Sequence, residues 1–228
     1  MKYIIIGLGS FGASLAIKLT EAGNEVIGID FNMSKVEALK EKISHTVKLD
    51  ATDLYAISSL PIKDTDVIIV AIGEDQGANI MATAAMRNMN VKRLISRAIS
   101  PLHENVLQAM GVDEIVHPEE ETAERWAKKL TLKGLVDSFE INDDYSIVEV
   151  NVPNWCVGKT LGDIGFRRNF NLLVMTTIKK TEEKTLLGIK RKIVTVQGVA
   201  SSSTVLNQGD IMVIYGDNRD IKKFMEYA

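Results

Sequence analysis

Two different spacings of apolar residues divide the chain into two parts. Up to residue 118, short β-branched runs alternate with longer stretches whose apolar residues recur every three or four positions. The expected strands are residues 3–6, 25–29, 46–49, 66–72, 93–96 and 114–116. The expected helices are residues 10–23, 33–42, 53–60, 76–89 and 100–111. Strands that alternate with helices predict βαβ units and a parallel sheet, so this part is predicted to be a doubly wound α/β domain.

The pattern changes after residue 118. A helix is expected over residues 118–132, with acidic residues in its first turn, lysines in its last turn and Gly134 after its end. Short strands are then expected at 146–152, 171–178, 192–196 and 211–216, and helical segments at 161–169 and 219–228. We therefore predict a nucleotide-binding domain over 1–133, which includes the long helix, and a small α+β domain over 134–228.

Composition narrows the class of protein. The 228 residues carry 27 Lys plus Arg against 30 Asp plus Glu, a net charge of −3, which argues against a nucleic-acid partner. No apolar stretch approaches the roughly 20 residues that span a bilayer, and no signal peptide is recognisable, so we expect a soluble cytoplasmic protein. The one cysteine, Cys156, excludes an intramolecular disulfide and is expected to be a small buried hydrophobe beside Trp155.

A glycine motif follows the first expected strand. Gly7, Gly9 and Gly12 have the spacing of the dinucleotide fingerprint, in which glycines allow a tight turn, approach of the pyrophosphate and close packing of a helix on a strand. Asp30 closes the next strand, where a carboxylate can accept hydrogen bonds from ribose hydroxyls and would repel the 2′-phosphate of NADP. The alternatives are that Asp30 caps the following helix and that the glycines form turns around an empty cradle.

Longer segments around these residues resemble the RCK or KTN domain of Ktr/Trk-type potassium-uptake gating subunits. The resemblance is carried by residues 2–30, 50–53 (DATD), 71–75 (AIGED), 78–80 (ANI) and 111–123 (GVDEIVHPEEETA), and in the second part by 154–180 and 206–224. It implies a Rossmann-like domain followed by a small RCK C-terminal domain. It also implies a homodimer and an octameric ring, attached on the cytoplasmic side to a membrane K+-translocating subunit that nucleotide binding would gate.

The resemblance also assigns residues to the site. The residues it places at the nucleotide are Gly7, Gly9, Ser10, Phe11, Gly12, Asp30, Asn32, Asp50, Ala51, Ile72, Gly73, Glu74, Arg97, Ala98, Ile99 and His103. The glycines would hold phosphates, Asp30 and Asn32 would read the ribose, and Asp50 and Ala51 would face adenine. Glu119 would bind Mg2+ or Ca2+, and cyclic di-AMP is a further ligand expected at the second domain.

Each of these side chains also has a simpler interpretation. Asp50 could cap the next helix, Arg97 could pair with a surface carboxylate, and His103 could be an ordinary surface histidine. Glu119 could belong to a solvated acidic helix start. The apolar pair Trp126 and Leu130, four residues apart, could face a second copy or lie in the core of its own chain.

Ser10 departs from the family pattern, in which an arginine often occupies this position. Loss of a charge-assisted hydrogen bond would weaken recognition of a γ-phosphate by roughly ten- to a hundredfold. The choice between ATP or ADP and NAD or NADH therefore stays open.

No catalytic group can be named. All three histidines (His45, His103 and His117) precede residue 134, and the second domain shows no nucleophile–base or metal-ligand arrangement. We predict a regulatory protein rather than an enzyme. The competing hypotheses are a stand-alone nucleotide or cyclic di-AMP sensor and an NAD-dependent oxidoreductase.

Overall fold

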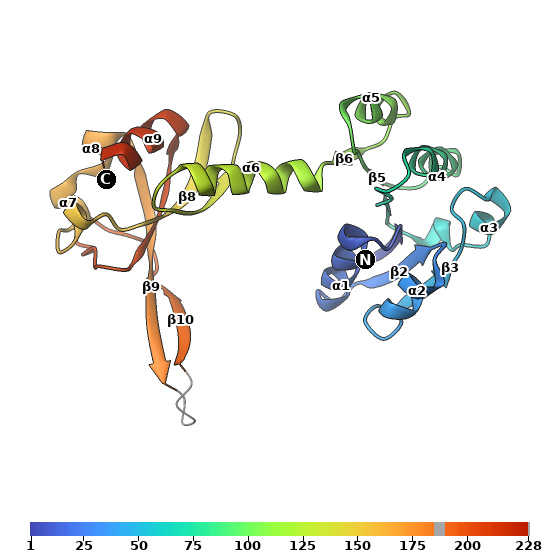
Figure 1. The fold of residues 1–228 in the computed structure, drawn as a ribbon, viewed down its shortest axis with the longest axis horizontal. Helices are drawn as coiled ribbons and strands as arrows, with labels where there is room; N and C mark the ends of the chain where they lie inside the picture. The colour runs from blue at the N-terminus through green and yellow to red at the C-terminus, as the bar shows by residue number, and fades with distance from the viewer. Residues whose placement is uncertain (185–189, 228) are drawn as a thin grey trace. The chain divides into compact units, whose positions relative to one another are not determined.

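The computed structural model describes residues 1–184 and 190–227 (Figure 1). Contacts divide the chain into two compact units, Met1–Glu119 and Glu120–Ala228. They are called the first and the second unit below. A domain boundary between residues 133 and 134 stays a prediction.

The first unit contains a six-stranded sheet in the order β3-β2-β1-β4-β5-β6, with every neighbouring pair parallel. The strands are β1 (Lys2–Ile6), β2 (Glu25–Asp30), β3 (His45–Lys48), β4 (Val67–Val70), β5 (Leu94–Arg97) and β6 (Glu114–Val116). The helices between them are α1 (Ser10–Glu21), α2 (Met33–Leu39), α3 (Leu54–Ser58), α4 (Gln76–Asn88) and α5 (Pro101–Ala109), with a 3-10 turn at Ile62–Asp64. The predicted doubly wound parallel sheet is confirmed.

Both faces of this sheet are buried. Ile4 and Ile6 of β1 belong to one apolar cluster, whereas Ile5 belongs to another, because successive side chains of a strand point to opposite faces. Strand β4 is buried at all four positions, as expected for a strand between two helical layers. The order of the strands reverses between β1 and β4, and such a switch point leaves a crevice at the carboxyl ends of the strands.

Helix α6 (Pro118–Thr131) continues from Glu119 into the second unit. The five-stranded sheet of this unit has the order β10-β9-β11-β8-β7 and is antiparallel throughout. Its strands are β7 (Leu135–Glu140), β8 (Tyr145–Asn151), β9 (Leu173–Lys184), β10 (Lys190–Val196) and β11 (Ile211–Asp217). The helical segments are a 3-10 turn at Asn154–Cys156, α7 (Leu161–Ile164), α8 (Phe166–Phe170) and α9 (Asn218–Tyr227).

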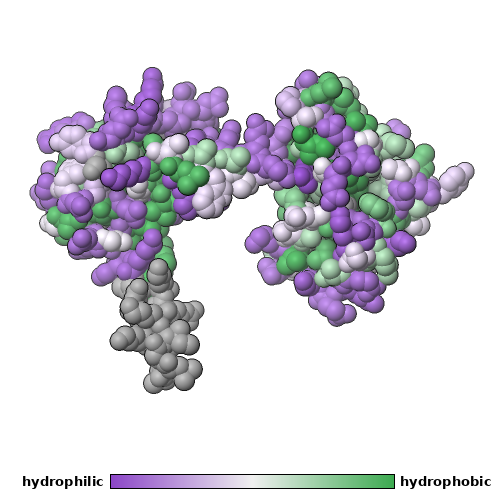
Figure 2. All heavy atoms as spheres, viewed as in Figure 1, coloured by the Kyte–Doolittle hydropathy of each residue, from purple (hydrophilic) through white to green (hydrophobic). Residues whose placement is uncertain are grey.

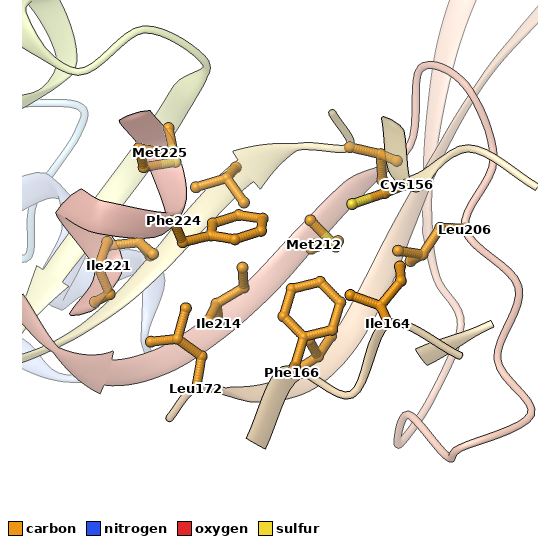
Figure 3. Close-up of a cluster of buried hydrophobic side chains, with 14 of the residues drawn as sticks. Cys156, Ile164, Phe166, Leu172, Leu206, Met212, Ile214, Ile221, Phe224 and Met225 are labelled. Carbon is orange, nitrogen blue, oxygen red and sulfur yellow. The ribbon is translucent and has the colours of Figure 1, made fainter. Parts of the chain in front are cut away.

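Among its described residues, one apolar cluster forms the core of the second unit (Figure 3). Phe224 and Ile221 of α9 and Phe166 of α8 pack with side chains of the sheet, such as Met212. Cys156 is fully buried in this cluster, and burial raises the pKa of its thiol to about 11. The thiol is therefore protonated at neutral pH, in agreement with the prediction of a small hydrophobe.

Two features of the second unit were not expected from the sequence. Strand β7 was not predicted, because Leu135 is its one buried residue and its other positions do not alternate between apolar and polar. Strand β10 pairs with β9 alone, and Figure 1 shows this hairpin extending from the rest of the second unit.

Candidate functional site

A cleft of about 310 Å³ opens at the switch point of the first unit. The residues that line it come from the carboxyl ends of five of the six strands and the loops that follow them, and from the starts of α1, α2, α4 and α6. They are Ile6, Gly7, Gly9, Ser10, Phe11, Ile29, Asp30, Phe31, Lys35, Leu49, Asp50, Ala51, Thr52, Ala71, Ile72, Gly73, Glu74, Asp75, Ala78, Arg97 and Glu119. The fold of this unit thus gathers residues that lie far apart in the sequence, from Ile6 to Glu119.

The turn from β1 to α1 lines the cleft with Gly7, Gly9 and Ser10. Gly7 has a φ of +98° and donates its N–H to the carbonyl of Ile29 at 2.8 Å. A Cβ atom at Gly12 would lie 2.0 Å from the carbonyl oxygen of Gly7, so α1 approaches the turn as closely as a helix can. Gly9 is the N-cap of α1, and no side chain caps that helix. An uncapped helix N-terminus is a binding site for an anion such as a phosphate.

Asp30 lies beside this turn at the end of β2. Asp30 is 5% exposed and lines the cleft, and its Oδ2 accepts a hydrogen bond from the N–H of Leu8 at 2.7 Å. Oδ1 accepts from the N–H of Asn32 at 2.8 Å. Each carboxylate oxygen can accept a second hydrogen bond, so Asp30 is held in position and can still receive ribose hydroxyls.

The helix that follows β2 is capped by Asn32. Its Oδ1 accepts from the N–H of Ser34 at 2.9 Å, and Asn32 does not line the cleft. The alternative that Asp30 is this cap does not hold. Similarly, Asp53 caps α3, whereas Asp50 accepts hydrogen bonds from the N–H and Oγ1 of Thr52. These hydrogen bonds lower the pKa of Asp50, which therefore stays ionised where it lines the cleft.

Arg97 brings positive charge to the cleft from the end of β5. Its guanidinium forms an ion pair with Glu119, and Nη1 lies 3.5 Å from the carbonyl oxygen of Ala71. The second cation that lines the cleft is Lys35 of α2, whose Nζ lies 3.4 Å from Oε1 of Glu74. Arg97 therefore lines the cleft, and it also has the carboxylate partner of the alternative interpretation, while a contact with nucleotide stays a prediction.

Besides Asn32, four other predicted site residues do not line the cleft. They are Gly12, Ala98, Ile99 and His103. Gly12 supports the turn from behind, and Ala98 is buried, with its N–H bonded to the carbonyl of Val116. His103 is 2% exposed, so it is not the surface histidine that the sequence suggested.

Phe31, Lys35, Thr52 and Asp75 line the cleft but were not predicted. Phe31 follows Asp30 directly and is an aromatic residue with 69% of its surface exposed. Lys35 follows the cap of α2 by one helical turn, which the sequence pattern alone does not distinguish from a surface lysine. Asp75 caps α4, with Oδ1 accepting from the N–H of Ala78 at 2.9 Å.

Within residues 1–184 and 190–227, no group of three or more His, Cys, Asp or Glu side chains could hold a metal ion. In the same residues, no helix combines the length and apolar character required to cross a membrane.

Residues 3–118 match the TrkA-N domain family. The chain is 33% identical over 223 residues to Ktr system potassium uptake protein C of Bacillus subtilis, covering 98% of this chain and 95% of that protein. It is 27% identical to Ktr system potassium uptake protein A of Vibrio alginolyticus, covering 94% of this chain and 92% of that protein.

Among solved structures, the GsuK channel bound to NAD matches with a TM-score of 0.62. The sequences are 19% identical, and the match covers 96% of this chain and 38% of that channel. This likeness supports the fold of both units.

Proposed function

The chain belongs to the TrkA-N family of RCK-domain proteins related to Ktr potassium uptake proteins, and from this premise we propose that it gates a membrane K+-translocating subunit in response to an adenine nucleotide. Its relatives are potassium uptake proteins rather than enzymes, as the sequence predicted. The observation that carries the proposal is the cleft in which the uncapped N-terminus of α1, Asp30 and Arg97 meet. The assembly would lie on the cytoplasmic face of the membrane, held by its transport partner.

The phosphates, ribose and adenine of a nucleotide would each contact a different part of the cleft. The phosphates would receive N–H groups from the first turn of α1, and the ribose hydroxyls would donate to Asp30. Adenine would lie near Asp50 and Ala51, which follow β3. Glu119 would supply one ligand to a Mg2+ or Ca2+ ion whose remaining ligands come from the phosphates and water.

Calorimetric titration with ADP, ATP, NAD and NADH tests the binding. The Asp30→Ala variant should lose affinity for all four, because the ribose hydroxyls lose a charged acceptor that contributes roughly 1.5–3 kcal/mol. Unchanged affinity in this variant would exclude the ribose contact.

The gating step needs a functional assay. K+ flux is measured in vesicles that hold this protein and its cognate transporter, with each nucleotide added in turn. Two nucleotides must give different fluxes, because a ligand that binds two conformations equally shifts no population. Flux that requires a nucleotide but is equal with all four would mean that the cleft holds a structural cofactor. Binding with the same flux in the presence and in the absence of nucleotide would favour a stand-alone sensor.

A second ligand is proposed for the second unit. A cleft of about 480 Å³ is lined by Arg167, Arg168, Ser201 and Ser202 together with apolar residues of α7 and β9. Two guanidinium groups and two hydroxyls suit the phosphates of cyclic di-AMP. Hydrogen exchange with added dinucleotide should protect residues 134–228, and no protection there would exclude this ligand.

A further inference from the structure

The Arg97 guanidinium is a largely buried cation at the cleft. Its side chain is 13% exposed, and Nε has no hydrogen-bond partner in the described part of the chain. The 3.5 Å contact between Nη1 and the carbonyl of Ala71 is long for a hydrogen bond. A desolvated cation requires an anion nearby, and in this structure the Glu119 carboxylate is that anion.

The guanidinium is fixed by its surroundings. A Cβ atom built at Gly73 would lie 2.3 Å from both Cζ and Nη1 of Arg97, so the guanidinium packs directly on the backbone of Gly73. The carbonyl of Arg97 accepts a hydrogen bond from the side chain of the buried Asn79 at 3.2 Å. Arg97 is thus held at both its backbone and its charged end.

Glu119, unlike Arg97, is largely exposed to solvent. Its side chain is 66% exposed, and it lies in the first turn of α6. A carboxylate that is already mostly hydrated can return to water at little cost. The ion pair therefore joins a guanidinium that is held in place to a carboxylate that another anion can replace.

Arg97 and Glu119 line the same cleft as Gly9 and Ser10, where the helix N-terminus would bind phosphates. We propose that Glu119 is a built-in competitor for the phosphate position at Arg97: a phosphate that reaches the guanidinium replaces the Glu119 carboxylate. The inference rests on the proposed nucleotide function and adds how the site would sense phosphate.

The position of Glu119 in the chain places this exchange at the junction of the two units. Glu119 is the last residue of the first unit, and Glu120 is the first residue of the second. Replacement of Glu119 by phosphate therefore releases a contact at the covalent junction between the unit that would bind nucleotide and the unit that follows it. Ligands without phosphate leave the contact in place.

The Glu119→Gln variant tests the competition. Titrations are made by calorimetry in EDTA, so that no divalent cation bridges the carboxylate and the ligand. ADP and ATP should bind roughly two- to fivefold more tightly than to the unaltered protein, because breaking the Arg97–Glu119 ion pair no longer opposes binding. The affinity for adenosine, which carries no phosphate, should not change.

Two further variants separate competition from a general effect of charge. Glu114→Gln removes the same charge from another Arg–Glu pair of the first unit, with Arg93, which does not line the cleft. It should not reproduce the tighter binding. Glu119→Gln in an Arg97→Met background should give no gain, because the contested cation is gone.

The outcomes distinguish this inference from the proposed function. Unchanged or weaker binding of ADP and ATP to Glu119→Gln would overturn the competition alone. A gain of equal size in Glu114→Gln, or one that persists in the Arg97→Met background, would also overturn it. Failure of the unaltered protein to bind any adenine nucleotide would overturn the proposed function as well.

Discussion

At the scale of single residues, two glycines of one motif have different tasks. A Cβ atom at Gly12 would collide with the carbonyl oxygen of Gly7, whereas a Cβ atom at Gly9 would meet nothing within 4 Å. Gly12 is therefore required by the folded protein itself. Gly9 leaves open a space that a ligand would occupy.

Substitution of the two glycines by alanine should separate stability from binding. Gly12→Ala should lower the free energy of unfolding by about 1–3 kcal/mol, because α1 must move away from β1. Gly9→Ala should keep the stability of the unaltered protein and weaken nucleotide binding. Urea denaturation and calorimetry measure the two effects, and equal urea midpoints for the two variants would contradict this division.

His103 gives the first unit a dependence on pH. It is buried in α5, neither ring nitrogen has a hydrogen-bond partner among the described residues, and burial lowers its pKa below 6.5. Below pH 6.5 the unfolded chain binds a proton that the folded chain does not, so stability is lost as the pH falls. Above that pH both states are neutral and the effect disappears.

The expected result is a urea midpoint that decreases between pH 7.5 and 5.5 in the unaltered protein. The decrease should be smaller in His103→Leu, which removes the titrating group. His45→Gln changes an exposed histidine of β3 and should leave the decrease in place. A decrease of the same size in His103→Leu would show that other groups cause it.

At the scale of secondary-structure elements, one side chain joins α4 to two strands. The Nδ2 atom of Asn79 donates to the carbonyls of Ile72 at 2.8 Å and Arg97 at 3.2 Å, next to the carboxyl ends of β4 and β5. Its Oδ1 accepts from Oγ of Ser96 at 3.1 Å. Because Asn79 is fully buried, these bonds fix the edge of the cleft on which Arg97 lies.

Asn79→Ala should reduce the free energy of unfolding by about 1–3 kcal/mol, since buried carbonyls lose their donor. It should also weaken nucleotide binding by loosening the ends of β4 and β5. Met81→Ala, on the exposed side of the same helix, should change neither property. Thermal denaturation and calorimetry of both variants make the comparison, and normal affinity in a destabilised Asn79→Ala would limit Asn79 to a structural role.

The elements of the first unit could be predicted because its strands are short runs rich in β-branched or apolar residues and its helices carry apolar residues at helical spacing. Asp30, Asp50 and Arg97 follow from the rule that ligands bind at the carboxyl ends of parallel strands. This rule does not predict which of Lys35 and Asn32 lines the cleft. Both lie near the start of α2, and the direction of the helix decides that Lys35 lines the cleft while Asn32 caps the backbone.

The sequence did not predict the burial of His103 either. Its position near the start of a helix is typical of an exposed side chain, and only the packing of α5 in the unit encloses it. Strand β7 was missed for a related reason. It is held by pairing with β8 rather than by an alternating pattern of its own.

At the scale of the whole molecule, α6 has no buried residue, and its apolar pair Trp126 and Leu130 is 53% and 78% exposed. Phe139 and Ile141, in and after β7, are also more than half exposed. Hydrophilic residues predominate on the face of the molecule shown in Figure 2, with apolar residues in smaller patches. Exposed apolar stripes of this kind are typical of association surfaces.

We therefore expect a homodimer or a larger ring in sedimentation experiments at micromolar concentration. Replacement of Trp126 and Leu130 together by lysine should shift the protein toward the monomer, because two buried charges would oppose association. Val199→Lys places a lysine on a fully exposed site outside α6 and should leave the assembly unchanged. A monomeric unaltered protein with nucleotide present would contradict the expectation.

Both tryptophans of the chain lie after Glu119, so the first unit contains no indole. Trp155 is packed against Phe170, Phe224 and Tyr227, whereas Trp126 is half exposed, with Nζ of Lys129 5.0 Å from its ring centre. The protein thus carries its own optical reporter of events beyond the junction. In a Trp155→Phe variant excited at the red edge of indole absorption, a shift of the emission maximum on addition of ADP would come from Trp126 alone. Binding of a ligand to the first unit would then be detected as a change in the emission wavelength of a tryptophan in the second unit.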